Sequence, residues 1–282
     1  MYAFPAAAST AVVLYAAFRQ RLTVRSYSEL SSKVRSCIRL ALLTDLHSTI
    51  YGHAQKALID LIRKQKPNII LLAGDIADDK VPHNGTIQLL SAIGQRYPCY
   101  YVAGNHEFRS LEIQRIKAMM RALHIHVLEG NSVTVEINGV SLRISGVDDP
   151  SGFPVQTADG RLFTRWDEQF QRVVSANTSD SYSILLTHRP ELTESYRSSG
   201  FDLVVAGHAH GGQVRIPGIL NGLYAPQQGI LPKYAGGRYQ LGKTALIVSR
   251  GLCKNSRPRV FNPPEVVVVD IIPMRCPSAA TE

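Results

Sequence analysis

Residues 38–47 have the sequence IRLALLTDLH, in which an apolar run ends in an aspartate and, two positions later, a histidine. Four further apolar runs are followed by polar clusters in the same way, so that the five runs are residues 38–43, 69–73, 99–103, 183–186 and 203–206. Runs this short, bounded by polar residues or glycine, favour buried strands over helices. Amphipathic stretches follow the first three runs, at 55–64, 86–93 and 111–123. This alternation predicts an α/β fold with a largely parallel portion.

The second half of the chain is richer in predicted strands. Residues 133–137 and 142–147 alternate in polarity around Asn138-Gly139, a pair that is typical of a tight hairpin turn. Residues 244–248 and 265–271 indicate two more strands, and the prolines just before residue 265 mark the start of the second. We therefore expect two sheets packed face to face, with helices on the outside.

The polar clusters at the ends of the five runs consist of residue types that bind metal ions. They are Asp45-Leu46-His47, Gly74-Asp75, Gly104-Asn105-His106-Glu107, Thr187-His188 and Gly207-His208-Ala209-His210. Ligands of open α/β sheets bind beyond the carboxyl ends of the strands. Side chains two positions apart in extended chain face the same way, so each pair within the first and last clusters can converge. A single Asp or His at a strand end is more commonly a helix cap or a satisfied polar residue, but five such clusters in this order favour a metal site.

The four cysteines, Cys37, Cys99, Cys253 and Cys276, are far apart and form no Cys-x-x-Cys pair. This spacing argues against a thiolate metal site and against a disulfide framework. Carboxylate, imidazole and amide ligands suit Mn, Fe or Zn, and also admit Ni or Co. With 282 residues, of which 45% are hydrophobic, the chain is expected to fold as one globular domain with a short segment at each end.

The N-terminal segment differs from the rest in charge. Residues 1–18 carry no charged side chain, whereas residues 19–39 carry six basic side chains and one acidic one, out of a net charge of +9. We interpret 1–18 as a membrane anchor and 19–36 as a basic linker, with the domain at 37–272 and a frayed tail at 273–282. Basic residues after the apolar segment place the domain on the cytoplasmic side. The alternatives for the segment are a helix lying on a surface or packed on the core, and those for the protein are an exported or a soluble one.

The five clusters resemble the motifs of the calcineurin-like metallophosphoesterase superfamily: D-x-H, G-D, G-N-H-E, a lone His and G-H-x-H. The resemblance runs from about residue 37 to 271. It implies a four-layer α/β/β/α sandwich of two mixed sheets and two divalent metal ions. It also implies a first-metal set of Asp45, His47, Asp75 and His210 and a second-metal set of Asp75, Asn105, His188 and His208, with Asp75 bridging.

The resemblance further implies the reaction. A hydroxide that bridges the two ions attacks phosphorus in line with the leaving oxygen, while the ions neutralise the developing charge. His106 is then not a ligand but faces the substrate, where it stabilises the transition state or protonates the leaving group. Asp78 matches the second Asp of a G-D-x-x-D pattern, so an Asp78–His106 pair is expected. The alternative is that Asp78 is a solvated loop residue, since Asp79 is adjacent.

Sequence details beyond the last ligand narrow the branch of the superfamily. The segments 211–217, 222–226, 232–234, 249–252 and 261–265 resemble a small bacterial branch of often membrane-associated phosphoesterases, some of which are similar to UDP-2,3-diacylglucosamine hydrolases. Cys253 replaces a glycine that this branch usually has, and the twin-arginine leader of some members is missing. The resemblance implies a phosphorylated small-molecule or lipid-linked substrate. Soluble nucleotides are the alternative substrate, and a non-catalytic metal-binding scaffold is a weaker alternative function.

The composition also bears on partners. Most of the positive charge lies near the N-terminus, so the catalytic region is close to neutral. A nuclease would need a basic track with stacking aromatic residues. We therefore expect neither a nucleic-acid nor a protein partner. The loop that runs from Tyr224 to Tyr234 is interpreted equally well as a substrate-pocket wall or as the cover of a sheet edge.

Overall fold

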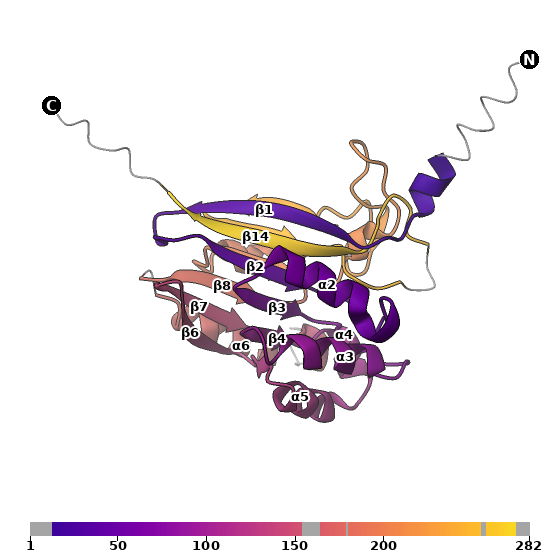
Figure 1. Ribbon diagram of the computed structural model, residues 1–282. Coiled ribbons are helices and arrows are strands. Elements are labelled where there is room, and N and C mark those ends of the chain that lie inside the picture. Colours follow the sequence, from indigo (N-terminus) through magenta and orange to yellow (C-terminus); the bar gives the residue numbers. More distant parts are fainter. Residues whose placement is uncertain (1–12, 154–163, 179, 255–257, 275–282) are drawn as a thin grey trace, which may run out of the picture.

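The computed structural model describes residues 13–153, 164–178, 180–254 and 258–274, and its arrangement is shown in Figure 1. Two six-stranded mixed sheets form its centre. In spatial order, the first sheet contains β1 (Thr23–Ser31), β14 (Glu265–Pro273), β2 (Ile38–Leu43), β3 (Ile69–Ala73), β4 (Cys99–Val102) and β5 (His126–Val127). The second contains β12 (Gly237–Leu241), β13 (Thr244–Val248), β9 (Leu203–Ala206), β8 (Tyr182–Leu186), β7 (Val140–Gly146) and β6 (Asn131–Ile137).

Each sheet has a parallel centre with antiparallel pairing nearby. Strands β2 to β5 are parallel to one another, and β14 runs antiparallel to β2. In the second sheet β7, β8, β9 and β13 are parallel, whereas β6 and β12 run antiparallel to their neighbours. The carboxyl ends of β2, β3, β4, β8 and β9 therefore carry the five polar clusters.

Helices and one small hairpin complete the fold. The helices are η1 (His53–Gln55), α2 (Lys56–Gln65), α3 (Asn84–Ile93), α4 (Asn105–Arg109), α5 (Ile113–Ala122), η2 (Pro150–Gly152), α6 (Thr164–Ser175), α7 (Thr193–Arg197) and η3 (His210–Gly212). The hairpin pairs β10 (Tyr224–Ala225) with β11 (Gly229–Ile230).

Three apolar clusters define four layers. The first lies between the sheets and holds alternate residues of β2, such as Leu40 and Leu42. The second holds the other set, Ala41 and Leu43, under the first-half helices α2, α3 and α5. The third packs α6 and α7 on the outer face of the second sheet. The central strands are thus buried on both faces, which explains their largely apolar sequences, and the layers confirm the predicted α/β/β/α sandwich.

The predicted hairpin at Asn138-Gly139 is confirmed. Ile137 pairs with Val140, so these two residues alone form the turn between β6 and β7. Their φ angles are 52° and 74°, which are the left-handed values that a tight hairpin turn requires.

The basic segment at 19–36, expected to be a linker, instead contains β1. This strand pairs in parallel with β14 over nine residues, from Thr23 with Glu265 to Ser31 with Pro273. Its basic side chain Arg25 is exposed, while the carboxylate of Glu29 is buried and accepts two hydrogen bonds from Arg238 of β12, at 2.6 and 2.9 Å. The basic residues of this segment suggested a linker, although the segment forms an edge strand with one buried side. The domain therefore begins before residue 37, and β14 carries it to residue 273.

Of the segment expected to be an anchor, residues 1–12 lie outside the described part, and 13–18 form a short helix. Within the described ranges, none of the helices combines the length and apolar character needed to cross a bilayer. The tail beyond residue 274 also lies outside the described residues.

Candidate metal centre

The five polar clusters meet at one edge shared by both sheets. Asp45 and His47 follow β2, Asp75 follows β3, and Asn105 begins α4 directly after β4. From the second sheet, His188 follows β8, and β9 leads into His208 and His210. Thus the seven residues expected to bind metal lie at neighbouring strand ends, although they are spread over much of the chain.

Each of the four histidines directs one of its two ring nitrogens toward a common centre. Oδ2 of Asp75 lies 3.2 Å from Nε2 of His188 and 3.6 Å from Nε2 of His47. His188 Nε2 is also 3.2 Å from Nδ1 of His208. On the other side of the centre, Nε2 of His210 lies 3.7 Å from Oδ1 of Asp45. These potential ligand atoms form two groups, one around Asp45 and His47 and one around His188 and His208, and Asp75 belongs to both.

The other ring nitrogen of each histidine is held from outside the centre. Nδ1 of His47 donates to Asp78 Oδ2 at 2.9 Å, and Nδ1 of His188 donates to the carbonyl of Ala73 at 2.8 Å. Nε2 of His208 donates to Gln227 Oε1 at 2.5 Å, and Nδ1 of His210 contacts Cys253 Sγ at 3.1 Å. Such outer contacts fix the tautomer and the ring orientation of metal-ligating histidines.

Several buried atoms of the centre have no hydrogen-bond partner. They are Nε2 of His47, Oδ2 of Asp75 and Oδ1 of Asn105. A buried polar atom without a partner is costly, and a protein retains it where something else satisfies it. All three are strong ligands for a divalent cation and belong to the expected ligand set, so the residues present fit a metal centre.

The backbone at the centre is strained. Five of the seven expected ligands have φ between 46° and 68°, namely Asp45, His47, Asp75, His208 and His210. Left-handed backbone is unfavourable for residues other than glycine and concentrates at functional sites. The left-handed residues are thus concentrated at the positions whose side chains meet at the centre.

Two glycines leave the space that the carboxylates of the centre occupy. A Cβ atom on Gly104 would lie 2.3 Å from Oδ1 of Asp75, and one on Gly207 would lie 2.5 Å from Oδ2 of Asp45. Any side chain at these positions would displace a carboxylate of the centre.

Glu107 binds the two first-sheet loops together. Its fully buried carboxylate accepts hydrogen bonds from the backbone N–H groups of Asp75, Ile76, Ala77 and Gly104, at 2.7 to 3.0 Å. The backbone N–H of His106, the residue before Glu107, is not among these donors and donates to Asp75 Oδ1 at 2.8 Å. The loop after β3 and the start of α4 are therefore a single hydrogen-bonded unit around the central carboxylate.

The expected Asp78–His106 pair is replaced by another. Nδ1 of His106 donates to Oδ1 of Asp79 at 2.6 Å, whereas it lies 3.9 Å from Oδ2 of Asp78. Asp78 instead holds His47 and caps the backbone N–H groups of Lys80 and Val81. The motif spacing therefore pointed to the wrong aspartate, because the turn after Ala77 directs Asp78 toward His47 and Asp79 toward His106.

Arg189 supplies positive charge beside His208. Its guanidinium donates two hydrogen bonds to Asp149, at 2.5 and 2.9 Å, and lies 3.3 Å from Nε2 of His208. Burial, together with the charges of His188 and Arg189, lowers the pKa of His208 to about 3. The His208 imidazole is therefore neutral, as a metal ligand must be.

Two other histidines have pKa values that are raised rather than lowered. Burial alone would lower the pKa of His188, but the Asp75 and Asp45 carboxylates raise it to about 10. Burial would also lower the pKa of His47, but its hydrogen bond to Asp78 and the charge of Asp75 raise this pKa to about 9. Without metal, these two imidazoles are protonated at neutral pH and supply the positive charge that the carboxylates require.

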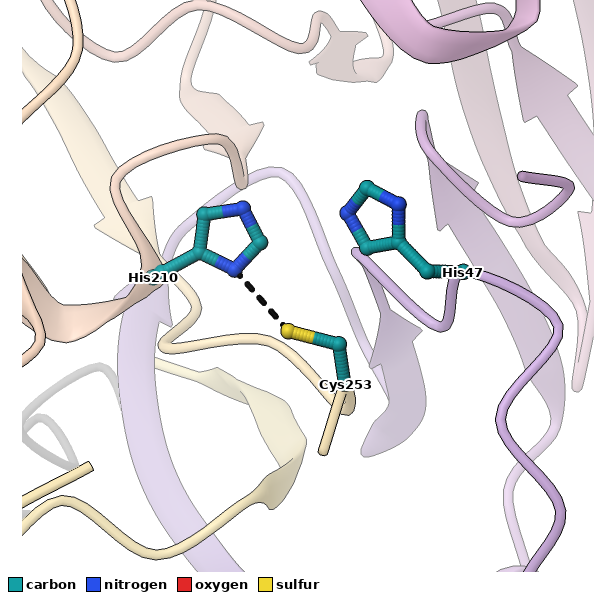
Figure 2. A group of neighbouring side chains, drawn as sticks. All are labelled: His47, His210 and Cys253. Atoms are coloured by element: carbon teal, nitrogen blue, oxygen red, sulfur yellow. Dashed lines mark hydrogen bonds between the residues drawn. The ribbon is translucent and has the colours of Figure 1, made fainter. Parts of the chain in front are cut away.

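Cys253 was not expected at the centre. It is buried, and its side chain points toward the rings of His210 and His47 from one side (Figure 2). The three residues form a potential ligand group. A sequence with widely spaced cysteines gave no signal for this contact. Gln227 and Asp79 were missed for the same reason: loop geometry, rather than residue spacing, brings them to the histidines.

Comparison with known proteins assigns the family. Residues 38–212 match the family described as calcineurin-like phosphoesterase. The chain belongs to this family. Its members use divalent metal ions, and the hydrolysis of phosphoesters is their characteristic reaction.

Individual relatives support this family assignment. A metallophosphoesterase of Aquifex aeolicus is 31% identical over 212 residues, which are 74% of each chain. One of Campylobacter jejuni is 30% identical over 268 residues, covering 92% of this chain and 66% of the relative. One of Caenorhabditis elegans is 30% identical over 189 residues, and only 37% of its length is covered. The chain thus spans two thirds or less of some of its relatives.

Solved structures share the fold. The 5′-nucleotidase precursor of Thermus thermophilus has a TM-score of 0.52 at 15% identity, with 84% of this chain and 54% of that chain covered. The sulfate thiohydrolase SoxB of the same genus has a TM-score of 0.52 at 15% identity, with 82% and 57% covered. Their similarity supports the metallo-dependent phosphatase fold.

Proposed function

We propose that this chain is a two-metal phosphoesterase that hydrolyses a phosphate ester or pyrophosphate. One observation carries the proposal: four imidazoles are each fixed on their outer nitrogen, while their inner nitrogens converge on Asp45 and Asp75. A set of structural histidines would have no reason to leave Nε2 of His47 and Oδ1 of Asn105 buried without partners.

The ligands divide into two sets around Asp75. Its Oδ2 atom lies within 3.6 Å of His47 on one side and within 3.2 Å of His188 on the other, which suits a bridging carboxylate. Asp45, His47 and His210 would complete the first position, and Asn105, His188 and His208 the second. When bound, a pair of divalent ions acidifies a shared water and neutralises charge on the phosphoryl oxygens.

We propose that His106 acts on the leaving group. Its ring makes an edge contact with that of His47, with centroids 4.4 Å apart, and its Nδ1 is bonded to Asp79. The remaining nitrogen, Nε2, carries a proton for the leaving oxygen only when the ring is an imidazolium, and after that transfer Nδ1–H stays bonded to Asp79. Burial lowers the pKa of His106, and the carboxylates of Asp75 and Asp79 oppose that shift by stabilising the charged ring.

A cavity next to the centre can take the rest of the substrate. It has a volume of about 650 Å³, and Asp78 and Asp79 form part of its wall. Its lining combines basic Lys80 and Arg115 with apolar residues such as Ile116. We propose that an amphipathic phosphorylated compound occupies it. A lipid-linked pyrophosphate such as UDP-2,3-diacylglucosamine and a soluble nucleotide are the two substrate classes to compare, with and without detergent.

The test is a pair of variants in the purified, chelator-treated protein reloaded with Mn, Fe or Zn. Asp75→Asn is expected to lose one or both ions and to reduce the turnover of bis(p-nitrophenyl) phosphate to background, because the bridging charge is lost. Asp60→Asn, on the exposed side of α2, is the matched control and is expected to resemble the wild type. Two bound ions and normal turnover in Asp75→Asn would refute the proposal.

A further inference from the structure

Exposed apolar side chains gather at one end of the molecule. Of the sixteen large apolar side chains that are exposed among the described residues, ten belong to the helical turn at 13–18 or to the loop at 214–231. The loop contributes Ile216, Ile219, Leu223, Tyr224, Ile230 and Leu231, of which Ile219 is 85% exposed and Ile230 is 75% exposed. We call the helical turn and the loop together the apolar face.

The two parts of the apolar face are joined through residues 260 and 261. The backbone N–H of Phe261 donates to the carbonyl of Ala17 at 2.7 Å, and that of Arg215 donates to the carbonyl of Val260 at 2.9 Å. In Figure 1 the indigo helical turn and the orange loop lie at the same end of the molecule. Isolated apolar residues on a surface are ordinary, but a continuous group marks an interaction site.

The chain segments that form and flank the apolar face carry basic but no acidic side chains. The sequence contains no Asp or Glu from residue 1 to 28 or from residue 203 to 264. Arg19, Arg21, Arg25 and Lys233 are exposed in these segments. Residues 1–12, which lead into the helical turn, are uncharged as well. An apolar surface bordered by cations without anions is complementary to a lipid bilayer with anionic headgroups.

The apolar face lies at the metal-binding edge of the sheets. Strand β1 starts beside the beginning of β14, and β14 pairs Val267 with Leu42 near the end of β2. The loop also reaches the centre itself, since Gln227 accepts a hydrogen bond from His208. A surface held by this face would therefore be next to the metal centre.

We infer that the apolar face is a docking surface for an anionic phospholipid membrane. A second copy of the chain fits less well, because a two-fold interface would bring two cation-rich, acid-free faces together. This inference goes beyond the proposed function: a membrane-bound protein can act on soluble or lipid-linked esters, and docking does not require catalysis.

The test is sedimentation of the full chain with vesicles of phosphatidylcholine, with and without phosphatidylglycerol. The wild type is expected to bind the anionic vesicles, and added salt is expected to weaken binding. The double variant Ile219→Glu/Ile230→Glu should bind at least ~10-fold more weakly, because two apolar side chains no longer enter the interface. Both positions are exposed, so the fold should be unaffected.

The matched control is Leu30→Glu/Met274→Glu, which changes two exposed apolar side chains outside the face, near the far ends of β1 and β14. It should bind vesicles like the wild type, and both double variants should hydrolyse bis(p-nitrophenyl) phosphate normally. Equal vesicle binding by both double variants and the wild type would overturn the inference. So would a dimer, seen by analytical ultracentrifugation, that only the Ile219→Glu/Ile230→Glu variant disrupts while vesicle binding is unchanged. Inactivity of the wild type would count against the proposed function alone.

Discussion

Two adjacent aspartates, Asp78 and Asp79, hold different histidines, and substitution should separate their roles. Asp78→Asn removes the charge that orients His47 at the first metal position while it keeps the side-chain shape that caps Lys80 and Val81. Loss of an outer partner of a metal ligand typically costs about 10- to 100-fold in metal affinity. We expect that loss for one of the two ions, measured by calorimetric titration of metal-free protein. Unchanged affinity for both ions would contradict the role of Asp78.

Asp79→Asn should instead reduce turnover without loss of metal. The carboxylate bonded to His106 Nδ1 is only 5% exposed, so its charge acts on the imidazole with little screening. Acid catalysis by a positioned group contributes about 10²- to 10⁴-fold, and a partner of that group should account for part of it. We expect kcat to fall roughly 10- to 100-fold for esters with basic leaving groups and much less for p-nitrophenyl esters. An equal effect on both ester classes, or a loss of metal, would show that Asp79 is only structural.

Cys253 holds His210 through a sulfur contact where a carboxylate or carbonyl is more usual. Buried Arg259 approaches the same sulfur at 3.7 Å and also donates to backbone carbonyls of this loop. Cys253→Gly should weaken the first metal position by about 10-fold, since His210 Nδ1 loses its partner. Cys253→Ser offers an oxygen at a similar place and should retain most of the affinity. Equal metal binding in all three proteins would mean that His210 is oriented without Cys253.

At the level of elements, the apolar runs predicted the central strands well because those strands are buried on both faces. Residues 69–73 and 203–206 are strands without a polar residue, and 38–43 contains only one, Arg39. Burial of one face alone gives a weaker pattern: β1, with exposed Arg25 and Ser26 beside half-buried Tyr27, was interpreted as a linker. The short hairpin β10–β11 depends on turn geometry and was also not predicted as strands.

The parallel pairing of β1 with β14 leads to a prediction about truncation. Removal of residues 1–36 deletes β1, exposes the hydrogen-bonding edge of β14 and leaves Arg238 without Glu29. That protein should unfold at a markedly lower temperature and aggregate through the open edge. Removal of residues 1–18 keeps the strand and should remain close to the wild type in thermal unfolding followed by circular dichroism. Equal melting temperatures for the two truncations would show that β1 adds no stability.

On the scale of the whole molecule, the expected ligand set came from the resemblance of the five clusters to a known family, and the strand ends that carry those clusters lie at one edge of the two sheets. The ligands are set by the strands themselves, which the apolar pattern locates. Their outer partners are not: Gln227 comes from a loop after the last ligand, and Cys253 comes from the segment after β13. Contacts between loops depend on backbone conformations such as the φ of 59° at Gln227. The residue pattern of the sequence does not predict such conformations.

Metal binding, folding and protonation are coupled across the molecule. In the metal-free protein the pKa of His47 is raised to about 9 and that of His188 to about 10, both above the unfolded value of 6.5. Their stabilising charge interactions are complete below pH 6.5 and are lost as pH rises through 9 to 10, so metal-free protein should lose stability over that range. Metal-loaded protein, in which both imidazoles are already neutral, should not show that loss.

Because cations must displace these protons, metal uptake at pH 7 should release roughly two protons, and affinity should rise with pH until both imidazoles are neutral. Isothermal titration in buffers of different ionisation enthalpy measures the number released. The Asp75→Asn variant tests the cause, since loss of the charge that raises the pKa of His188 should reduce the protons released per ion bound. Uptake of metal by the wild type without proton release at pH 7 would mean that the histidines are neutral beforehand and that carboxylate charge does not control the centre.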